Sequence, residues 1–252
     1  MSRLTPGSGF LGILVALAVL LPPASVSAQQ DDWPSPIHDD QLFWFLIFEQ
    51  LEVASVSGSE PVVWDVQGWV GGDYNRFWMK SDGEAPTRGG GGDFEMQALY
   101  GRLIAPFWDL QVGVRYDRQF GSDGRSRVHL VLGVQGLAPY WFEVEPAVFV
   151  SQDGDVSARL TASYDMLLTQ RLILQPEVEI NLAAQTVVEW GVGSGLTDLS
   201  AELRLRYEFR REFAPYVGVG WFERFGRTAD LARSAGESVV ELAVLGGFRI
   251  WF

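Results

Sequence analysis

The chain contains no cysteine, which excludes disulfide bonds, thiolate metal sites and a lipid-modified cysteine anchor. It has only 2 histidines and 4 methionines among 252 residues, so imidazole and thioether ligands for a metal are scarce. Basic residues number 19 against 32 acidic ones, and the formal net charge of −13 argues against a nucleic-acid partner. Beyond residue 28, no apolar run is long enough to cross a membrane as a helix.

The one long apolar run lies at the start of the chain. Phe10 to Leu21 follows Arg3 and precedes the small residues Val26-Ser27-Ala28. The run is too short to span a bilayer as a helix, and the layout is typical of a cleavable secretory signal. We therefore expect a signal peptide over residues 1–28, a periplasmic linker over 29–43 and a single domain over 44–252.

The rest of the chain alternates apolar and polar residues with a period of two. A clear example sets Trp108, Leu110, Val112 and Val114 against Asp109, Gln111, Gly113 and Arg115. This pattern predicts about twelve strands, near 44–54, 62–70, 74–81, 94–104, 108–118, 127–137, 140–150, 156–167, 171–183, 196–208, 214–225 and 239–252. Many are long enough to cross a membrane at a tilt, with the apolar face toward lipid and the charged face inward. The sequence predicts an all-β fold, a transmembrane antiparallel up-and-down β-barrel of the bacterial outer-membrane type.

The connections between these strands alternate in length. Short turns are expected at the periplasmic end, where both termini lie, and longer surface loops at 81–93, 120–127, 183–195 and 226–237. Ala105-Pro106-Phe107, Ala138-Pro139-Tyr140 and Ala214-Pro215-Tyr216 each fall at a predicted short turn. Proline suits a turn, and we expect the aromatic residue after it to lie at the height of the lipid headgroups.

The last predicted strand ends the chain on Phe252, and Phe248 and Ile250 share its apolar face. Such an ending resembles the C-terminal signal that the barrel-insertion machinery of bacteria reads. That machinery and outer-membrane lipid are therefore expected partners. An ordinary C-terminal strand of a soluble β-sandwich is the alternative.

Carboxylates recur on the inward face at a spacing of two residues, in Glu143 with Glu145 and Glu177 with Glu179. On a strand, this spacing places both on one face about 7 Å apart. The predicted ladder brings Glu179 near Arg159, and Glu177 near Glu202 and Arg204. The acids then form either a weak site for divalent cations or a salt-bridged network that fills the interior.

The two histidines offer little further chemistry. His129 is predicted to point inward near the outer end of its strand, and a metal site would need further donors around it. His38 lies in the linker with Asp39 and Asp40, where it could capture a metal ion only weakly. His129 has no sequence-evident serine and acid partner, so we expect no enzyme.

Several long segments resemble the copper resistance protein B family. They include Asn75-Arg76-Phe77-Trp78-Met79-Lys80, Ala105-Pro106-Phe107-Trp108-Asp109-Leu110-Gln111, Leu167-Leu168-Thr169-Gln170-Arg171-Leu172-Ile173-Leu174-Gln175-Pro176-Glu177 and Arg210-Arg211-Glu212-Phe213-Ala214-Pro215-Tyr216. The resemblance implies an outer-membrane protein of Gram-negative bacteria that binds copper ions or moves them across the membrane. It also implies a periplasmic multicopper oxidase as a partner.

One segment departs from the family. Members often carry a Met- and His-rich stretch before the barrel, whereas residues 29–41 here have no methionine and only His38. Thioether sulfur suits Cu(I), so the soft-ligand site of the family is missing from this stretch. A small-solute or cation-selective porin without a specific copper site is the alternative function.

Overall fold

The computed structural model describes residues 41–56, 60–87, 91–121 and 124–252. The expected signal peptide and His38 lie outside these residues. The strands are β1 (Phe43–Val56), β2 (Pro61–Gly71), β3 (Asn75–Pro86), β4 (Gly92–Ala105), β5 (Trp108–Phe120), β6 (Arg125–Ala138), β7 (Phe142–Ser151), β8 (Val156–Ser163), β9 (Met166–Leu167), β10 (Leu172–Ala183), β11 (Gly195–Tyr207), β12 (Phe213–Arg224) and β13 (Val240–Trp251).

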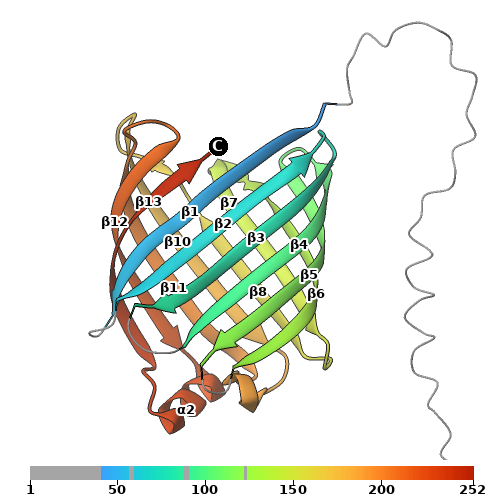
Figure 1. The fold of residues 1–252 in the computed structure, drawn as a ribbon, viewed down its shortest axis with the longest axis vertical. Helices are drawn as coiled ribbons and strands as arrows, with labels where there is room; N and C mark the ends of the chain where they lie inside the picture. The colour runs from blue at the N-terminus through green and yellow to red at the C-terminus, as the bar shows by residue number, and fades with distance from the viewer. Residues whose placement is uncertain (1–40, 57–59, 88–90, 122–123) are drawn as a thin grey trace, which may run out of the picture. The chain divides into compact units, whose positions relative to one another are not determined.

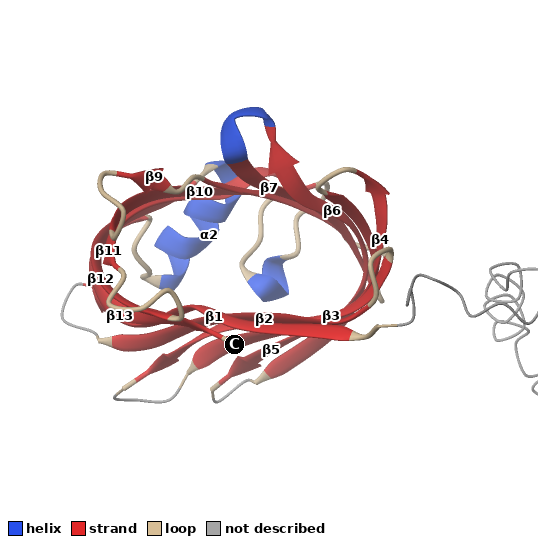
Figure 2. Ribbon diagram, turned by 90° about the horizontal axis from the view of Figure 1, so that it is seen from above, coloured by secondary structure: helices blue, strands red, loops and turns tan. Residues whose placement is uncertain are grey.

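Apart from β8 and β9, which do not pair with each other, the strands pair antiparallel with their neighbours in the chain, and the sheet closes on itself (Figure 1). β8 and β9 pair with different parts of β10 and together occupy one strand position in the wall. The 13 strand segments therefore make a barrel of twelve strands. β13 closes the ring by pairing with both β12 and β1. Seen along its axis, the ring is oval, with β1–β3 facing β6–β10 across the interior (Figure 2). The predicted fold is confirmed.

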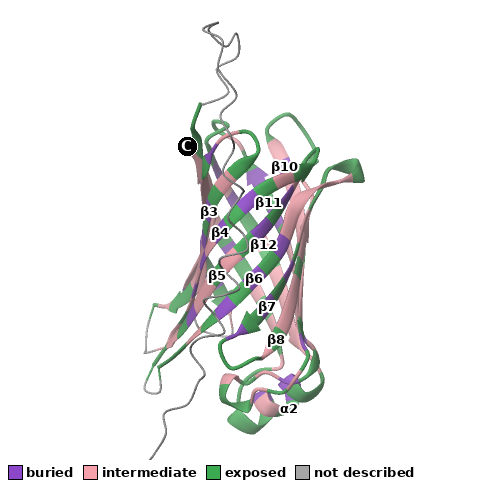
Figure 3. Ribbon diagram, turned by 90° about the vertical axis from the view of Figure 1, so that its right-hand side faces the viewer, coloured by how far each residue is buried: buried purple, intermediate pink, exposed green. Residues whose placement is uncertain are grey.

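Burial alternates along the strands as the sequence pattern requires (Figure 3). On β5, Val112 is 50% exposed on the outside whereas Gln111 beside it is 1% exposed on the inside. Buried Asp117 on β5 and buried Arg204 on β11 follow the same rule. The barrel is therefore inverted relative to a soluble protein, with apolar residues outward and charged residues inward.

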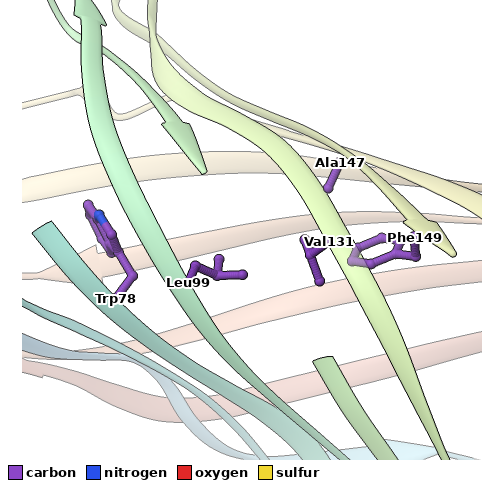
Figure 4. Packing of buried hydrophobic residues seen from close by; sticks show 5 residues of the cluster. All are labelled: Trp78, Leu99, Val131, Ala147 and Phe149. Atoms are coloured by element: carbon purple, nitrogen blue, oxygen red, sulfur yellow. The ribbon is translucent and has the colours of Figure 1, made fainter. Parts of the chain in front are cut away.

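The interior also holds one apolar row. Its members are buried and follow neighbouring ladder positions from β3 to β7: Trp78, Leu99, Val131, Ala147 and Phe149 (Figure 4). Trp78 pairs with Leu99, and Val131 pairs with Phe149. This row gives one wall of the interior a packed, uncharged lining.

The short turns gather at the end that holds the C-terminus, as predicted (Figure 1). Phe107 and Tyr140 follow proline in two of them, and both adopt a φ of 69°, which is uncommon for residues other than glycine. Both side chains are exposed. The third Ala-Pro-aromatic segment does not behave this way, and the prediction for Tyr216 is wrong. β12 already begins at Phe213, so alternation turns Tyr216 into the barrel, where it is 5% exposed.

The opposite end differs from the prediction in two places. β3 runs to Pro86 and β4 begins at Gly92, so the expected long loop at 81–93 is mostly strand. The expected loop at 120–127 is shorter for the same reason, because β5 ends at Phe120 and β6 begins at Arg125. The segment after β12 is not a plain loop but contains helix α2 (Gly226–Ala235). Thr228 of α2 accepts a hydrogen bond from the Gly193 nitrogen at 2.9 Å, which ties the helix to the β10–β11 connection. Among the described residues, no helix has the length and apolar character needed to cross a membrane.

β1 carries an irregularity at its centre. Phe48 pairs with Val66 and Gln50 pairs with Asp65, so Glu49 is an extra residue in the ladder with β2. The bulge sends two consecutive side chains, Glu49 and Gln50, to the same interior cavity. On its other side, the ladder between β1 and β13 shifts between Phe48 and Glu52.

Candidate functional site

Two connected cavities lie in the central part of the lumen. The smaller has a volume of about 90 Å³ and lies toward the short turns, where Glu49, Glu143 and Gln175 line it. The larger has a volume of about 360 Å³ and lies toward the opposite end, where Asp82, Asp93 and Glu179 line it. The two share lining residues at their junction: Gln50, Asp65, Gln67, Glu145, Thr161 and Glu177. The lumen is therefore one polar path with two chambers.

Acidic side chains dominate this path. Within the described residues, ten acids line the two chambers: Glu49, Asp65, Asp82, Glu84, Asp93, Glu143, Glu145, Glu177, Glu179 and Glu202. Three basic residues line them: Lys80, Arg159 and Arg204. A passage whose walls carry an excess of one charge concentrates ions of the opposite sign. The arrangement favours cations over anions.

The four predicted carboxylates all reach the lumen but have different partners. Glu179 lies 3.6 Å from the Arg159 guanidinium, and Glu177 lies 3.7 Å from that of Arg204, as the predicted ladder requires. Glu145 forms an ion pair with Lys80. Glu143 forms no ion pair with any described residue, and neither does Asp65. Most of the acids are therefore bound in a network, while a few carboxylates remain available to a passing ion.

Arg204 is the centre of the tightest cluster. Its guanidinium is 3.3 Å from the Glu52 carboxylate and also contacts Glu202, and both Arg204 and Glu52 are nearly fully buried. A second cluster joins Arg159 to Glu95 at 2.9 Å, with Arg115 at 2.7 Å from the same carboxylate. Burial in low-dielectric surroundings makes such pairs costly to break. These clusters fix the shape of the charged lining.

His129 lies apart from the four carboxylates. It points inward, is 2% exposed and lines a third cavity of about 210 Å³ near the end that holds α2. Its Nδ1 is 3.7 Å from the Asp117 carboxylate, which Arg115 and Arg127 already bind. Two guanidinium groups beside the ring disfavour a metal cation there. The structure does not bring His129 together with Glu143, Glu145, Glu177 or Glu179.

The lumen offers oxygen rather than sulfur donors. Met79 and Met166 are 45% and 42% exposed, and Met96 lies in a groove on the outer face with Met79. Within the described ranges, no three His, Cys, Asp or Glu side chains converge on one point. The donor set fits weak, transient contact with a hydrated divalent ion such as Cu(II), and it does not fit a soft Cu(I) site.

Several lumen residues are absent from the predicted site. Asp65 alternates with Gln67 in the second strand, and this pattern in the sequence could have placed it inward. Glu49 follows the inward alternation of Ile47, whereas Gln50 faces the lumen only because of the bulge in β1, for which the sequence gives no clear sign. The partner of Lys80 lies across the barrel, and strand periodicity does not predict such contacts.

Comparison with known proteins adds the family. Residues 42–252 match the family model described as copper resistance protein B precursor. The chain is 44% identical to copper resistance protein B of Escherichia coli over 216 residues, which is 86% of this chain and 72% of the relative. It is 38% identical to the copper resistance protein B homolog of Pseudomonas syringae pv. tomato, with the same coverage of both chains.

The solved structure of the NanC porin is similar in fold, with a TM-score of 0.54 at 12% identity, and the match covers 81% of this chain and 98% of that one. At this identity, the likeness shows the barrel alone. Together, the barrel fold and the sequence relatives indicate an outer-membrane protein that serves copper resistance. The chain belongs to the copper resistance protein B family.

Proposed function

We propose that this barrel promotes copper tolerance by admitting copper ions to its acidic lumen and moving them across the outer membrane. The observation that carries the proposal is the excess of carboxylates over basic groups along the two connected chambers. Copper is the cargo in this proposal and is held by oxygen donors in passing. The soft-ligand capture expected of the family is left to other proteins.

The proposed orientation places the short turns and the C-terminus in the periplasm and α2 at the cell surface. The outward apolar face then meets outer-membrane lipid, and β13, with Phe248, Ile250 and Phe252, presents the signal to the barrel-insertion machinery. The periplasmic end delivers copper to, or receives it from, the periplasmic multicopper oxidase that the family implies. The predicted signal peptide over residues 1–28 provides export.

We also propose that the barrel is not an enzyme. The structure does place Asp117 and Ser151 beside His129, which the sequence alone did not reveal. However, the Ser151 hydroxyl accepts hydrogen bonds from the Asp153 and Asp155 nitrogens at 3.2 and 3.0 Å. A nucleophile must instead share a hydrogen bond with its base, and none joins Ser151 to His129 among the described residues.

Titration of the purified, detergent-folded protein with Cu(II) and with Cu(I) tests the proposal. Saturable Cu(II) binding that weakens in Glu143→Gln and Glu145→Gln variants would support direct copper handling in the lumen. Glu189→Gln is the matched control, because Glu189 is exposed outside the lumen in the β10–β11 connection. A His129→Ala variant should bind copper as the parent does.

A cation-selective or small-solute porin without a specific copper site is the second candidate. Within the described part of the chain, no three side chains of the metal-binding types lie close enough together to hold one ion. This observation favours a porin without a specific copper site. If no variant or parent binds copper above the detergent blank, this second function replaces the first. Equal sensitivity of parent and deletion strains to copper, together with loss of uptake of unrelated solutes, would lead to the same conclusion.

A further inference from the structure

Lys80 is the single lysine of the chain, and its side chain points into the lumen from β3. The side chain is 10% exposed, and its ammonium donates a hydrogen bond to the Glu145 carboxylate on β7. β4, β5 and β6 separate β3 from β7 in the wall. The contact therefore crosses the lumen instead of following a strand ladder.

This contact lies where the two chambers meet. Glu145 lines both chambers, whereas Lys80 lines only the larger. Two further hydrogen bonds cross the lumen at this level. Gln50 donates to Glu177 at 3.4 Å, and Gln135 donates to Gln67 at 3.3 Å. The three contacts form a polar layer that divides the path, and we call this layer the bridge layer.

Lys80 is the cation that reaches across the lumen within the bridge layer. Arg159 on β8 also crosses the larger chamber, but it binds Glu95 at 2.9 Å and lies 3.6 Å from Asp82, outside the three contacts of this layer. Arg204 lies near the layer, but its guanidinium is bound to Glu52 and Glu202. A lysine ammonium is a compact point charge on a flexible four-carbon stem and can move aside. The Lys80 ammonium lies 5.8 Å from the centre of the Trp78 ring, a member of the buried apolar row, which provides a fixed surface for the stem.

We propose that Lys80 controls cation passage through the lumen. The Lys80 ammonium is bound to the Glu145 carboxylate at the bridge layer, and a cation in transit has to compete with this ammonium for the carboxylate. The positive charge also repels cations at the junction, so passage is slower than the acidic chambers alone would allow. This inference rests on the proposed function, because it concerns how the same lumen selects its cargo.

Single-channel recording on the full mature chain in planar lipid bilayers tests the inference. Lys80→Met removes the charge and keeps an unbranched side chain, whereas Lys80→Arg keeps the charge. One unit charge about 6 Å away in water disfavours a cation about threefold and favours an anion about threefold. In a KCl gradient, Lys80→Met should therefore raise the cation-to-anion permeability ratio about tenfold. Its conductance should rise as well, and Lys80→Arg should match the parent. Heat-modifiable mobility on gels confirms that each variant is folded.

The two proposals can fail separately. If folded Lys80→Met has the conductance and reversal potential of the parent, the role of Lys80 is overturned and the proposed function stands. If the parent prefers anions, the proposed function fails. The change in the cation-to-anion permeability ratio between the parent and Lys80→Met then still decides the role of Lys80. If neither protein carries current, both proposals are overturned.

Discussion

Replacement of Arg204 by methionine should destabilise the barrel strongly. Arg204 is 2% exposed and holds Glu52 at 3.3 Å, with Glu202 and Glu177 on its other side. Methionine fills similar space but leaves these carboxylates without their cation. Removal of one partner from a buried ion pair typically costs about 3–5 kcal/mol, because the remaining charge stays desolvated. We expect a loss of this size in the free energy of unfolding.

Urea unfolding of the refolded protein in lipid vesicles, followed by tryptophan fluorescence, measures this loss. Arg233→Met is the matched control, because Arg233 and Asp230 also pair at 3.0 Å but are 61% and 59% exposed on α2. An exposed pair contributes about 0–1 kcal/mol, so the control should unfold like the parent. Adding Glu52→Gln to Arg204→Met should restore part of the loss. A loss below about 1 kcal/mol for Arg204→Met would show that water reaches this cluster and would refute the reasoning.

Two further predictions concern the ends of the barrel. Phe252→Ala should lower the amount of folded, heat-modifiable barrel in cells while the refolded protein keeps parental stability, because the Phe252 side chain is 59% exposed and packs no interior. Normal levels in cells would argue against an assembly role for the C-terminal residue. Gly193→Val should detach α2, because a Cβ there would lie 2.4 Å from the Thr228 nitrogen, and tryptic cleavage within 226–237 should become faster. An unchanged cleavage rate would show that the connection yields without moving the helix.

The sequence predicts the barrel well because each strand meets lipid on one side and water on the other. Alternation of Val112 with Gln111, or of Leu203 with Arg204, is a direct result of that environment. Ladder contacts follow from alternation and turn length, and for this reason the predicted proximity of Glu179 to Arg159 and of Glu177 to Arg204 is confirmed.

The same reasoning fails where the environment is no longer two-sided. At the end of β3, Ser81-Asp82-Gly83-Glu84 is polar on both faces, so periodicity ends although the ladder with β4 continues. Helix α2 has only a short amphipathic stretch, and contact with the β10–β11 connection stabilises it. Contacts across the lumen, such as Lys80 with Glu145, depend on the oval cross-section of the ring, which no local pattern encodes (Figure 2).

The irregular ladder between β1 and β13 has a consequence for how the ring holds together in salt. Backbone pairing is interrupted between Phe48 and Glu52, where the first and last strands of the barrel meet. Arg249 of β13 reaches across this gap and donates two hydrogen bonds to the Glu49 carboxylate, at 2.6 and 3.2 Å. A side-chain ion pair thus takes the place of backbone hydrogen bonds where β1 and β13 close the ring. Because partly exposed ion pairs weaken as ionic strength rises, the resistance of this seam to lateral opening should fall as salt is added.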